Sequence, residues 1–123
     1  MNSLFDISGK TALITGSGQG LGYTLATGLA KAGCRIILND VDPLRLDAAV
    51  KQLSSEGYEV FGAAFDVSNE EQVRAGIDSL KGSVEKIDIL VNNAGIQIRG
   101  MLEDFDTAKW DLMMNVNLKG VFV

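Results

Sequence analysis

The sequence predicts an α/β domain built on a doubly wound parallel sheet. Three observations predict this fold. Short apolar runs alternate with helical patterns along the chain, a glycine-rich turn joins the first run to the first helix, and no repeat, low-complexity segment or linker interrupts the order. Strands covered on both faces are continuous apolar runs, and crossovers between parallel strands are right-handed. The 123 residues suit one domain.

The expected order of elements is strand, helix, strand, helix, through four strands. Strands are expected at 11–15, 35–39, 60–65 and 87–92, and helices at 21–32, 43–56, 69–80 and from 107 to the end. Pro43 suits a first helical turn, and Ser68 or Asn69 is the expected N-cap of the third helix. Ligands of such sheets bind beyond the carboxyl ends of the strands, so functional residues are expected directly after each strand.

Composition argues against several kinds of chemistry. The net charge is −5 and the 11 lysines and arginines are scattered, which argues against nucleic acid and anionic membrane surfaces as partners. There is no histidine and one cysteine, Cys34, so histidine-based nucleophile systems are absent and no metal site is expected. We expect Cys34 to be a small buried filler between a helix and a strand.

Targeting signals are not expected either. No apolar run reaches the roughly 18 residues needed to span a bilayer. The start of the chain has no basic segment followed by an apolar stretch, so it does not resemble a secretory signal. These features predict a cytoplasmic location.

A glycine-rich turn follows the first strand and opens the first helix. Its residues are, in order, Thr15, Gly16, Ser17, Gly18, Gln19, Gly20, Leu21 and Gly22. Such a turn presents backbone N–H groups and the positive end of the helix dipole, and its glycines allow a phosphate to approach closely. The sequence therefore predicts a dinucleotide phosphate site here. The alternative is a glycine-rich turn without a ligand.

Asp40 follows the second strand, about 20 residues beyond the glycine turn. A carboxylate at this point can accept hydrogen bonds from both ribose hydroxyls of an adenosine, and its charge repels a 2′-phosphate. This predicts NAD as the cofactor, in preference to NADP. The alternative is an aspartate that serves the turn into the helix at Asp42-Pro43.

Polar residues also follow the third and fourth strands. Asp66-Val67 could hold the adenine amino group, although a turn aspartate explains it nearly as well. After the fourth strand come Asn92, Asn93, Ala94 and Gly95. Their small residues and amides would let the chain approach a ligand, but Asn and Gly are also ordinary in a turn at a strand end.

Together these strings resemble the short-chain dehydrogenase/reductase family. The glycine turn matches the family's cofactor loop, and Asp66-Val67 matches its adenine-contact dipeptide. The Asn-Asn-Ala-Gly string matches the signature after strand four, and residues 115–122 match a segment of the fifth helix. In that segment Asn117 takes the place of the catalytic asparagine. The resemblance covers the whole chain.

The resemblance implies a Rossmann fold, here its N-terminal four-strand portion, and an NAD(P)-dependent oxidoreductase. In that family hydride passes between nicotinamide and a carbinol or carbonyl, a serine holds the substrate oxygen, and a tyrosine with a pKa lowered by a lysine transfers the proton. Residues 1–5, 37–40 and 92–97 resemble most closely the sugar-acid dehydrogenases that act on gluconate. In those enzymes Arg99 would border the substrate, where its guanidinium could bind the carboxylate; the alternative is a solvated loop arginine.

The catalytic serine and the Tyr-x-x-x-Lys motif of the family are expected beyond residue 123. Tyr23 and Tyr58 are the only tyrosines, and neither is followed by lysine four positions later. We therefore expect residues 1–123 to be a dinucleotide-binding domain that binds the cofactor and has no turnover alone.

Two other functions stay open. One is a non-catalytic nucleotide-binding module. The other is an S-adenosylmethionine methyltransferase, although that family ordinarily has an acidic residue before its glycines, where Thr15 stands. The family resemblance implies a small sugar-acid substrate and a homodimer or homotetramer. Trp110, Met113 and Phe122 would contribute to the subunit interface or, equally, to the core.

Overall fold

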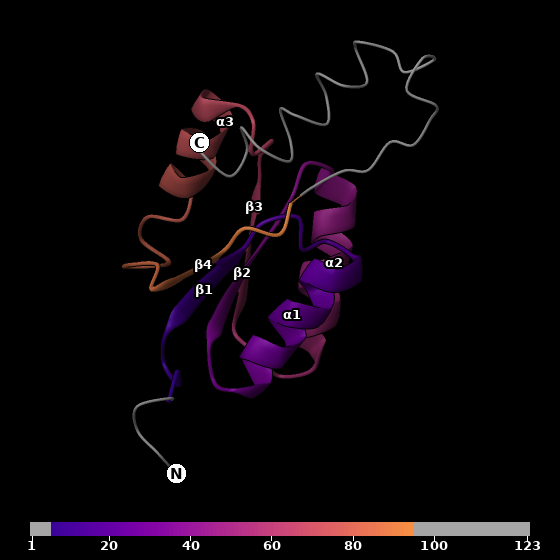
Figure 1. Cartoon of the computed structure of the whole chain (residues 1–123), viewed down its shortest axis with the longest axis vertical. Coiled ribbons are helices and arrows are strands. Elements are labelled where there is room, and N and C mark those ends of the chain that lie inside the picture. Colours follow the sequence, from indigo (N-terminus) through magenta and orange to yellow (C-terminus); the bar gives the residue numbers. More distant parts are fainter. Residues whose placement is uncertain (1–5, 95–123) are drawn as a thin grey trace, which may run out of the picture.

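A four-stranded parallel sheet organises residues 6–94, which are the residues that the computed structural model describes (Figure 1). The strands are β1 (Thr11–Ile14), β2 (Arg35–Asp40), β3 (Val60–Ala64) and β4 (Ile89–Val91). The helices are α1 (Gly20–Lys31), α2 (Pro43–Ser55) and α3 (Glu70–Asp78). The spatial order is β3-β2-β1-β4, so the direction of winding reverses at β1. Ligands of doubly wound sheets bind at such a reversal.

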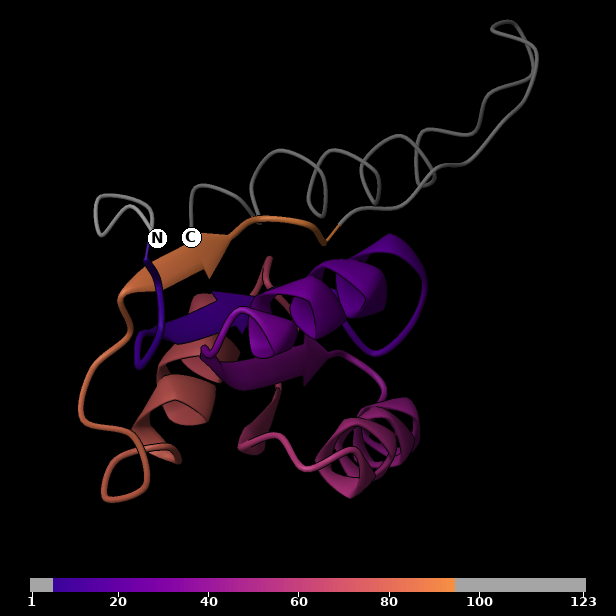
Figure 2. The ribbon, with the colours of Figure 1, turned by 90° about the horizontal axis from the view of Figure 1, so that it is seen from below.

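Helices cover both faces of this sheet. α1 and α2 lie on one face and α3 lies on the other (Figures 1 and 2). The chain moves from β1 to β2 to β3 in one direction and returns from β3 to β4 in the other. Because each crossover is right-handed, the reversal sends α3 to the opposite face.

The strand register brings the chain's functional loops to one edge of the sheet. Ile14, at the end of β1, is paired with Leu38 of β2 and Val91 of β4. The residues that follow these three positions are the glycine turn, the Asn39-Asp40 pair and the Asn-Asn-Ala-Gly string. The sequence prediction that these motifs meet beyond the strand ends is therefore confirmed for the residues the structure describes.

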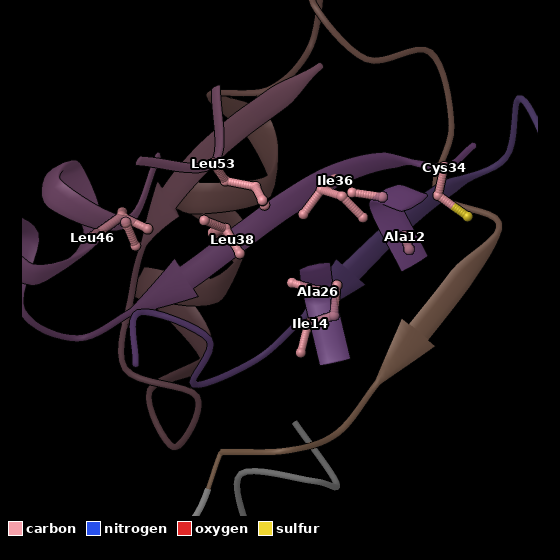
Figure 3. Close-up of a cluster of buried hydrophobic side chains, with 10 residues drawn as sticks. Ala12, Ile14, Ala26, Cys34, Ile36, Leu38, Leu46 and Leu53 are labelled. Atoms are coloured by element: carbon pink, nitrogen blue, oxygen red, sulfur yellow. The ribbon is translucent and has the colours of Figure 1, made fainter. Parts of the chain in front are cut away.

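The two faces of the sheet bury separate apolar clusters. The cluster under α1 and α2 is shown in Figure 3 and includes Ala12, Ile14, Ala26, Cys34, Ile36, Leu38, Leu46 and Leu53. The cluster under α3 consists of Leu13, Ile37, Ala63, Phe65, Val67, Leu80 and Val84. Burying a large aliphatic side chain contributes about 1.5–3 kcal/mol. The two central strands supply buried residues to both clusters, so packing on both faces holds the strands from which the binding edge extends.

Local sequence explains where the helices begin. Asp42 is the N-cap of α2, where its carboxylate accepts from the backbone N–H groups of Leu44 and Arg45, and Pro43 fills the first helical position. Asn69 is the N-cap of α3, and its side chain accepts from the Gln72 N–H at 3.1 Å. Of the two caps expected for the third helix, Asn69 is the correct one.

The elements predicted within residues 6–94 are all present, with ends shifted by one or two residues. The fourth strand is the shortest relative to its prediction of 87–92, for a physical reason. The Asp88 carboxylate accepts from the Thr11 N–H at 2.9 Å, and the Asp88 N–H donates to the Thr11 carbonyl. A side chain thus replaces one regular ladder contact before β4 begins at Ile89.

Cys34 is buried between α1 and β2, as the sequence predicts. Burial, followed by the charge of Asp88, raises the pKa of its thiol. A protonated, buried thiol is unreactive, which agrees with a filler role. The helix predicted from residue 107 lies outside the described residues.

Candidate functional site

The glycine turn is shaped by contacts that leave no room for side chains. Gly16 and Gly20 have φ values of 62° and 64°, which glycine adopts without strain. A Cβ on Gly16 would lie 2.8 Å from the Ala94 Cα, and one on Gly18 would collide with the Asp40 carboxylate. A Cβ on Gly22 would collide with the Asn93 side chain and the Gly16 carbonyl. The glycines therefore let three loops pack against one another.

The start of α1 is open to a ligand. Gln19 is its N-cap residue, yet the Gln19 side chain makes no capping hydrogen bond, and no acidic residue lies in the first turn. The first N–H groups of a helix have no partner within the helix. Together with the helix dipole, these donors make the turn a suitable site for an anion such as phosphate. Gln19, Gly20 and Leu21 are exposed there.

Thr15 and Asn93 connect the glycine turn to the loop after β4. The Thr15 hydroxyl accepts from the backbone N–H groups of Asn93 and Ala94, both at 3.0 Å. The Asn93 amide nitrogen donates to the Gly16 carbonyl at 3.1 Å. Asn93 and Ala94 are half-buried by these contacts, whereas Asn92 is exposed. The predicted Asn-Asn-Ala-Gly motif thus positions the turn, and Gly95 lies outside the described residues.

The buried side chain of Asn39 holds the glycine turn in place, and the sequence alone did not identify this role. Its side-chain oxygen accepts from the Gly16 N–H at 3.1 Å, and its amide nitrogen donates to the carbonyls of Ala63 and Phe65 at 3.0 and 3.2 Å. Only 1% of Asn39 is exposed. One buried amide therefore joins the turn after β1 to the ends of β2 and β3. The only signal in the sequence was a polar residue at the end of an apolar strand run, next to Asp40.

Ser17 lies inside the turn, away from its surface. Its hydroxyl donates to the Ile14 carbonyl at 2.6 Å and accepts from the Asn39 N–H at 3.0 Å. The Ser17 N–H donates to the Asn39 carbonyl at 2.7 Å. The side chain is fully buried, so Ser17 fixes the shape of the turn while its neighbours form the surface.

Asp40 lies at the end of β2, facing the glycine turn. Its side chain is 6% exposed and packs against Gly18. One carboxylate oxygen accepts from the Asp42 N–H at 3.0 Å and from the Arg45 guanidinium at 3.3 Å. Asp40 therefore serves the turn into α2, which was the alternative interpretation of its sequence position. The same carboxylate lies beside the glycine turn, and its ribose role stays a prediction.

A groove lies between the glycine turn and α2. It has a volume of about 330 Å³, and its lining residues are Gly18, Gln19, Tyr23, Arg45, Ala48, Ala49 and Gln52. Among these residues Arg45 alone carries a charge, and its side chain is 39% exposed. Sequence reasoning did not identify Arg45, because helical periodicity alone does not show that it faces Asp40.

Asp66 and Val67 follow β3 at the same edge. One Asp66 carboxylate oxygen accepts from the N–H and the hydroxyl of Ser68 at 2.9 and 2.7 Å, as in a turn leading into a helix. The Val67 side chain is buried in the cluster under α3. The turn role of Asp66 is thus observed, and its second oxygen and the Val67 backbone remain the groups that could contact a base. Arg99 and Asn117 lie outside the described residues.

Neither tyrosine has the setting of a proton-transfer residue. Tyr23 lies in α1, where burial and then the charge of Glu56 raise its pKa. Proton transfer near neutral pH requires a lowered tyrosine pKa. Tyr58 is half-buried against the core before β3.

Among residues 6–94, no helix is long and apolar enough to cross a membrane. The same residues contain no cluster of three or more His, Cys, Asp or Glu side chains that could hold a metal ion.

Comparison with known proteins agrees with this site. The sequence profile of the short chain dehydrogenases matches residues 10–123. The 5-keto-D-gluconate 5-reductase of Escherichia coli (strain K12) is 42% identical over the whole chain and is covered over 48% of its own length. The chain thus spans about half the length of the curated relatives it matches.

Solved structures are similar as well. A gluconate 5-dehydrogenase from Burkholderia cenocepacia J2315, in complex with NADP and tartrate, has a TM-score of 0.88 and 48% identity over 96% of this chain and 46% of its own. A short chain dehydrogenase/reductase from Burkholderia phymatum, in complex with NAD, has a TM-score of 0.89 and 38% identity over 96% of this chain and 42% of its own. The four-stranded parallel sheet, the glycine turn and the profile match lead to one conclusion: the chain belongs to the short-chain dehydrogenase family.

Proposed function

We propose that this chain is the cofactor-binding portion of an NAD(P)-dependent oxidoreductase. The reaction is hydride transfer between nicotinamide and the secondary alcohol or ketone of a sugar acid such as gluconate or 5-ketogluconate. The observation that carries the proposal is the uncapped N-terminus of α1. The glycine turn before it packs closely against the loop after β4 and against Asp40. The sugar-acid substrate rests on the relatives, among them the 5-keto-D-gluconate 5-reductase.

The residues present fit a dinucleotide. The α1 N-terminus supplies donors for the pyrophosphate, and the glycines leave the space that Cβ atoms would fill. In this proposal Asp40 accepts from the adenosine ribose, and the Asp66 carboxylate or the Val67 backbone contacts the adenine. The cofactor-binding residues that we propose are Gly16, Ser17, Gln19, Gly20, Leu21, Gly22, Asp40, Asp66, Val67, Asn93, Ala94 and Gly95.

These residues divide into two roles. Gln19, Gly20 and Leu21 would contact the cofactor, since they are exposed at the surface of the turn. Asp40 would contact it from the strand end beside the turn, through its second carboxylate oxygen. Ser17, Asn93 and the glycines with close contacts would hold the turn in shape, because their own groups bind neighbouring loops. The bound cofactor supplies the hydride chemistry, while the chain supplies position and electrostatics.

The remaining chemistry falls outside residues 6–94. We propose that Arg99 binds the substrate carboxylate and that Asn117 takes the catalytic asparagine role, both from the family resemblance. The Tyr-x-x-x-Lys motif does not occur in these 123 residues. We therefore propose that residues 1–123 alone bind the cofactor without turning over substrate.

Calorimetric titration with NADH and NADPH, followed by turnover assays on the intact protein, tests the proposal. We expect binding of at least one cofactor, oxidation of gluconate with the oxidised cofactor, and reduction of 5-ketogluconate with the reduced one. Binding without turnover of any sugar acid would favour the nucleotide-binding module. Preferential binding of S-adenosylmethionine would refute the oxidoreductase and favour a methyltransferase.

We also propose that the protein is a cytoplasmic homodimer or homotetramer, as the family resemblance implies. Light scattering on the intact protein measures the assembly directly. A monomeric mass at micromolar concentration would refute this part of the proposal.

A further inference from the structure

The groove beside the glycine turn adjoins the carboxylate that is expected to select the cofactor. Gly18 contributes to the lining of the groove and also contacts the Asp40 carboxylate. Arg45, a second residue of the groove lining, pairs with the same carboxylate, so the groove begins beside Asp40. Its volume of about 330 Å³ leaves space for a group the size of a phosphate.

The charge of Asp40 is balanced from within the groove. The Arg45 guanidinium lies 3.3 Å from an Asp40 oxygen and 3.8 Å from an Asp42 oxygen. A buried carboxylate without a partner would repel a phosphate strongly. The Arg45 guanidinium, which Asp40 shares with Asp42, lowers the charge of this group from −2 to −1 and so weakens the repulsion. The prediction that Asp40 excludes NADP assumes a free carboxylate, and that assumption does not hold for this pair.

Arg45 also keeps donors available for a ligand. A guanidinium has five N–H donors in a planar fork, and Arg45 makes one side-chain hydrogen bond within the described residues, through Nη1 to Asp40. Its side chain is 39% exposed, whereas that of Asp40 is 6% exposed. The arginine can therefore turn toward the groove while the carboxylate stays in place. Arg binds phosphate well because two of its N–H groups match two phosphate oxygens.

We propose that Arg45 is the residue that allows this protein to accept NADP as well as NAD, by binding the 2′-phosphate in the groove. With NAD, Arg45 stays on Asp40, and the second Asp40 oxygen accepts from the ribose. With NADP, the Arg45 guanidinium lies between the phosphate and the carboxylate and offsets the repulsion. This inference rests on the proposed cofactor-binding function.

The test is the ratio of NADPH to NADH dissociation constants in the intact protein, measured by calorimetry for the wild type and Arg45→Gln. Loss of a charge-assisted contact predicts about 10- to 100-fold weaker NADPH binding, with NADH changed less than about twofold. Arg35→Gln is the matched control. Arg35 also pairs with a carboxylate, that of Glu59, but it lies at the opposite end of β2. Arg35→Gln should leave both constants unchanged.

Arg45→Lys is the control for a loss of folding in Arg45→Gln. It keeps a positive charge beside Asp40 but offers a point charge in place of a fork, so NADPH binding should fall less than in Arg45→Gln and NADH binding should stay the same. If both cofactors weaken equally in both variants, Arg45 only supports the α2 turn and the inference is wrong. The inference is also wrong if the wild type binds NADH but not NADPH. If the wild type binds neither, the proposed function itself fails, which is a distinguishable result.

Discussion

Replacing Asn39 by aspartate probes how far the binding edge depends on one buried amide. Asn39→Asp changes little in shape, yet it removes the N–H donors that reach the Ala63 and Phe65 carbonyls at 3.0 and 3.2 Å. A carboxylate oxygen would then face two carbonyl oxygens in a site that is 1% exposed. The acceptor contact to the Gly16 N–H can persist, because a carboxylate still accepts there.

The expected destabilisation follows from these contacts. Leaving buried polar groups unsatisfied lowers the free energy of unfolding by about 1–3 kcal/mol per group, and more when a charge is involved. Two carbonyls lose their donor, so Asn39→Asp should lower the free energy of unfolding by at least about 3 kcal/mol at pH 7. Asn92→Asp is the matched control. Asn92 is exposed at the end of the neighbouring β4, so its change should stay within about 0.5 kcal/mol.

The pH dependence has a defined sign. Burial beside carbonyls raises the pKa of the introduced carboxyl group above its unfolded value of about 3.9. The part of the penalty that comes from ionisation is therefore absent below that pH and grows as the pH rises toward the folded pKa. Urea unfolding at pH 5.5 and pH 7.5 should show Asn39→Asp losing more stability relative to the wild type at the higher pH. An equal loss at both pH values, or no loss beyond that of Asn92→Asp, would refute the role assigned to Asn39.

Three further predictions concern the turn, the strand β4 and the cofactor. Gly22→Ala should abolish most cofactor binding and lower the melting temperature, because its Cβ would lie 2.6 Å from the Gly16 carbonyl oxygen. Gly28→Ala in the same helix meets nothing within 4 Å, so it should preserve cofactor binding and the melting temperature, and equal effects of the two substitutions would contradict the close packing of the turn. The hydrogen bond from the Thr11 N–H holds the pKa of Asp88 below its ordinary 3.8, so the wild type should lose more stability than Asp88→Asn as the pH falls below that value. Urea unfolding that gives the two proteins the same change in unfolding free energy between about pH 5 and pH 3 would refute this. Asp40→Asn should weaken NADH binding about tenfold and tighten NADPH binding, and a calorimetric result in which both weaken alike would argue that Asp40 acts only through the α2 turn.

The architecture could be predicted from the sequence because its signals are local. Apolar runs with helical segments between them fix a parallel sheet, and the Asp42-Pro43 and Asn69 positions fix where α2 and α3 begin. The glycine turn was predicted for the same reason, since its glycines follow a strand and open a helix. The position at which a strand begins or ends can depend on contacts that are distant in the sequence. Asp88 shortens β4 through a contact with Thr11, which lies 77 residues away in the chain.

The supports of the turn could not be predicted because each depends on a partner far along the chain. Thr15 meets Asn93 and Ala94 across 78 and 79 residues, and Asn39 meets Gly16 across 23. A buried polar residue needs hydrogen-bond partners, but the position of Asn39 at the end of an apolar run shows neither its burial nor its partners. Only the parallel register, which sets Ile14 beside Leu38 and Val91, shows which loops come together.

Asp40 shows how a correct position can still lead to an incomplete chemical inference. The sequence places an acid at the strand end, and a free acid there implies that NADP is repelled. The structure adds that one carboxylate oxygen already accepts two donors, from the Asp42 N–H and Arg45, while the other oxygen faces Gly18. What the site offers a ribose is thus one oxygen of a carboxylate whose other oxygen is paired with a guanidinium. Cofactor preference then depends on the pair and on the groove beside it, so a substitution at Arg45 should alter the choice of cofactor even though Asp40 is untouched.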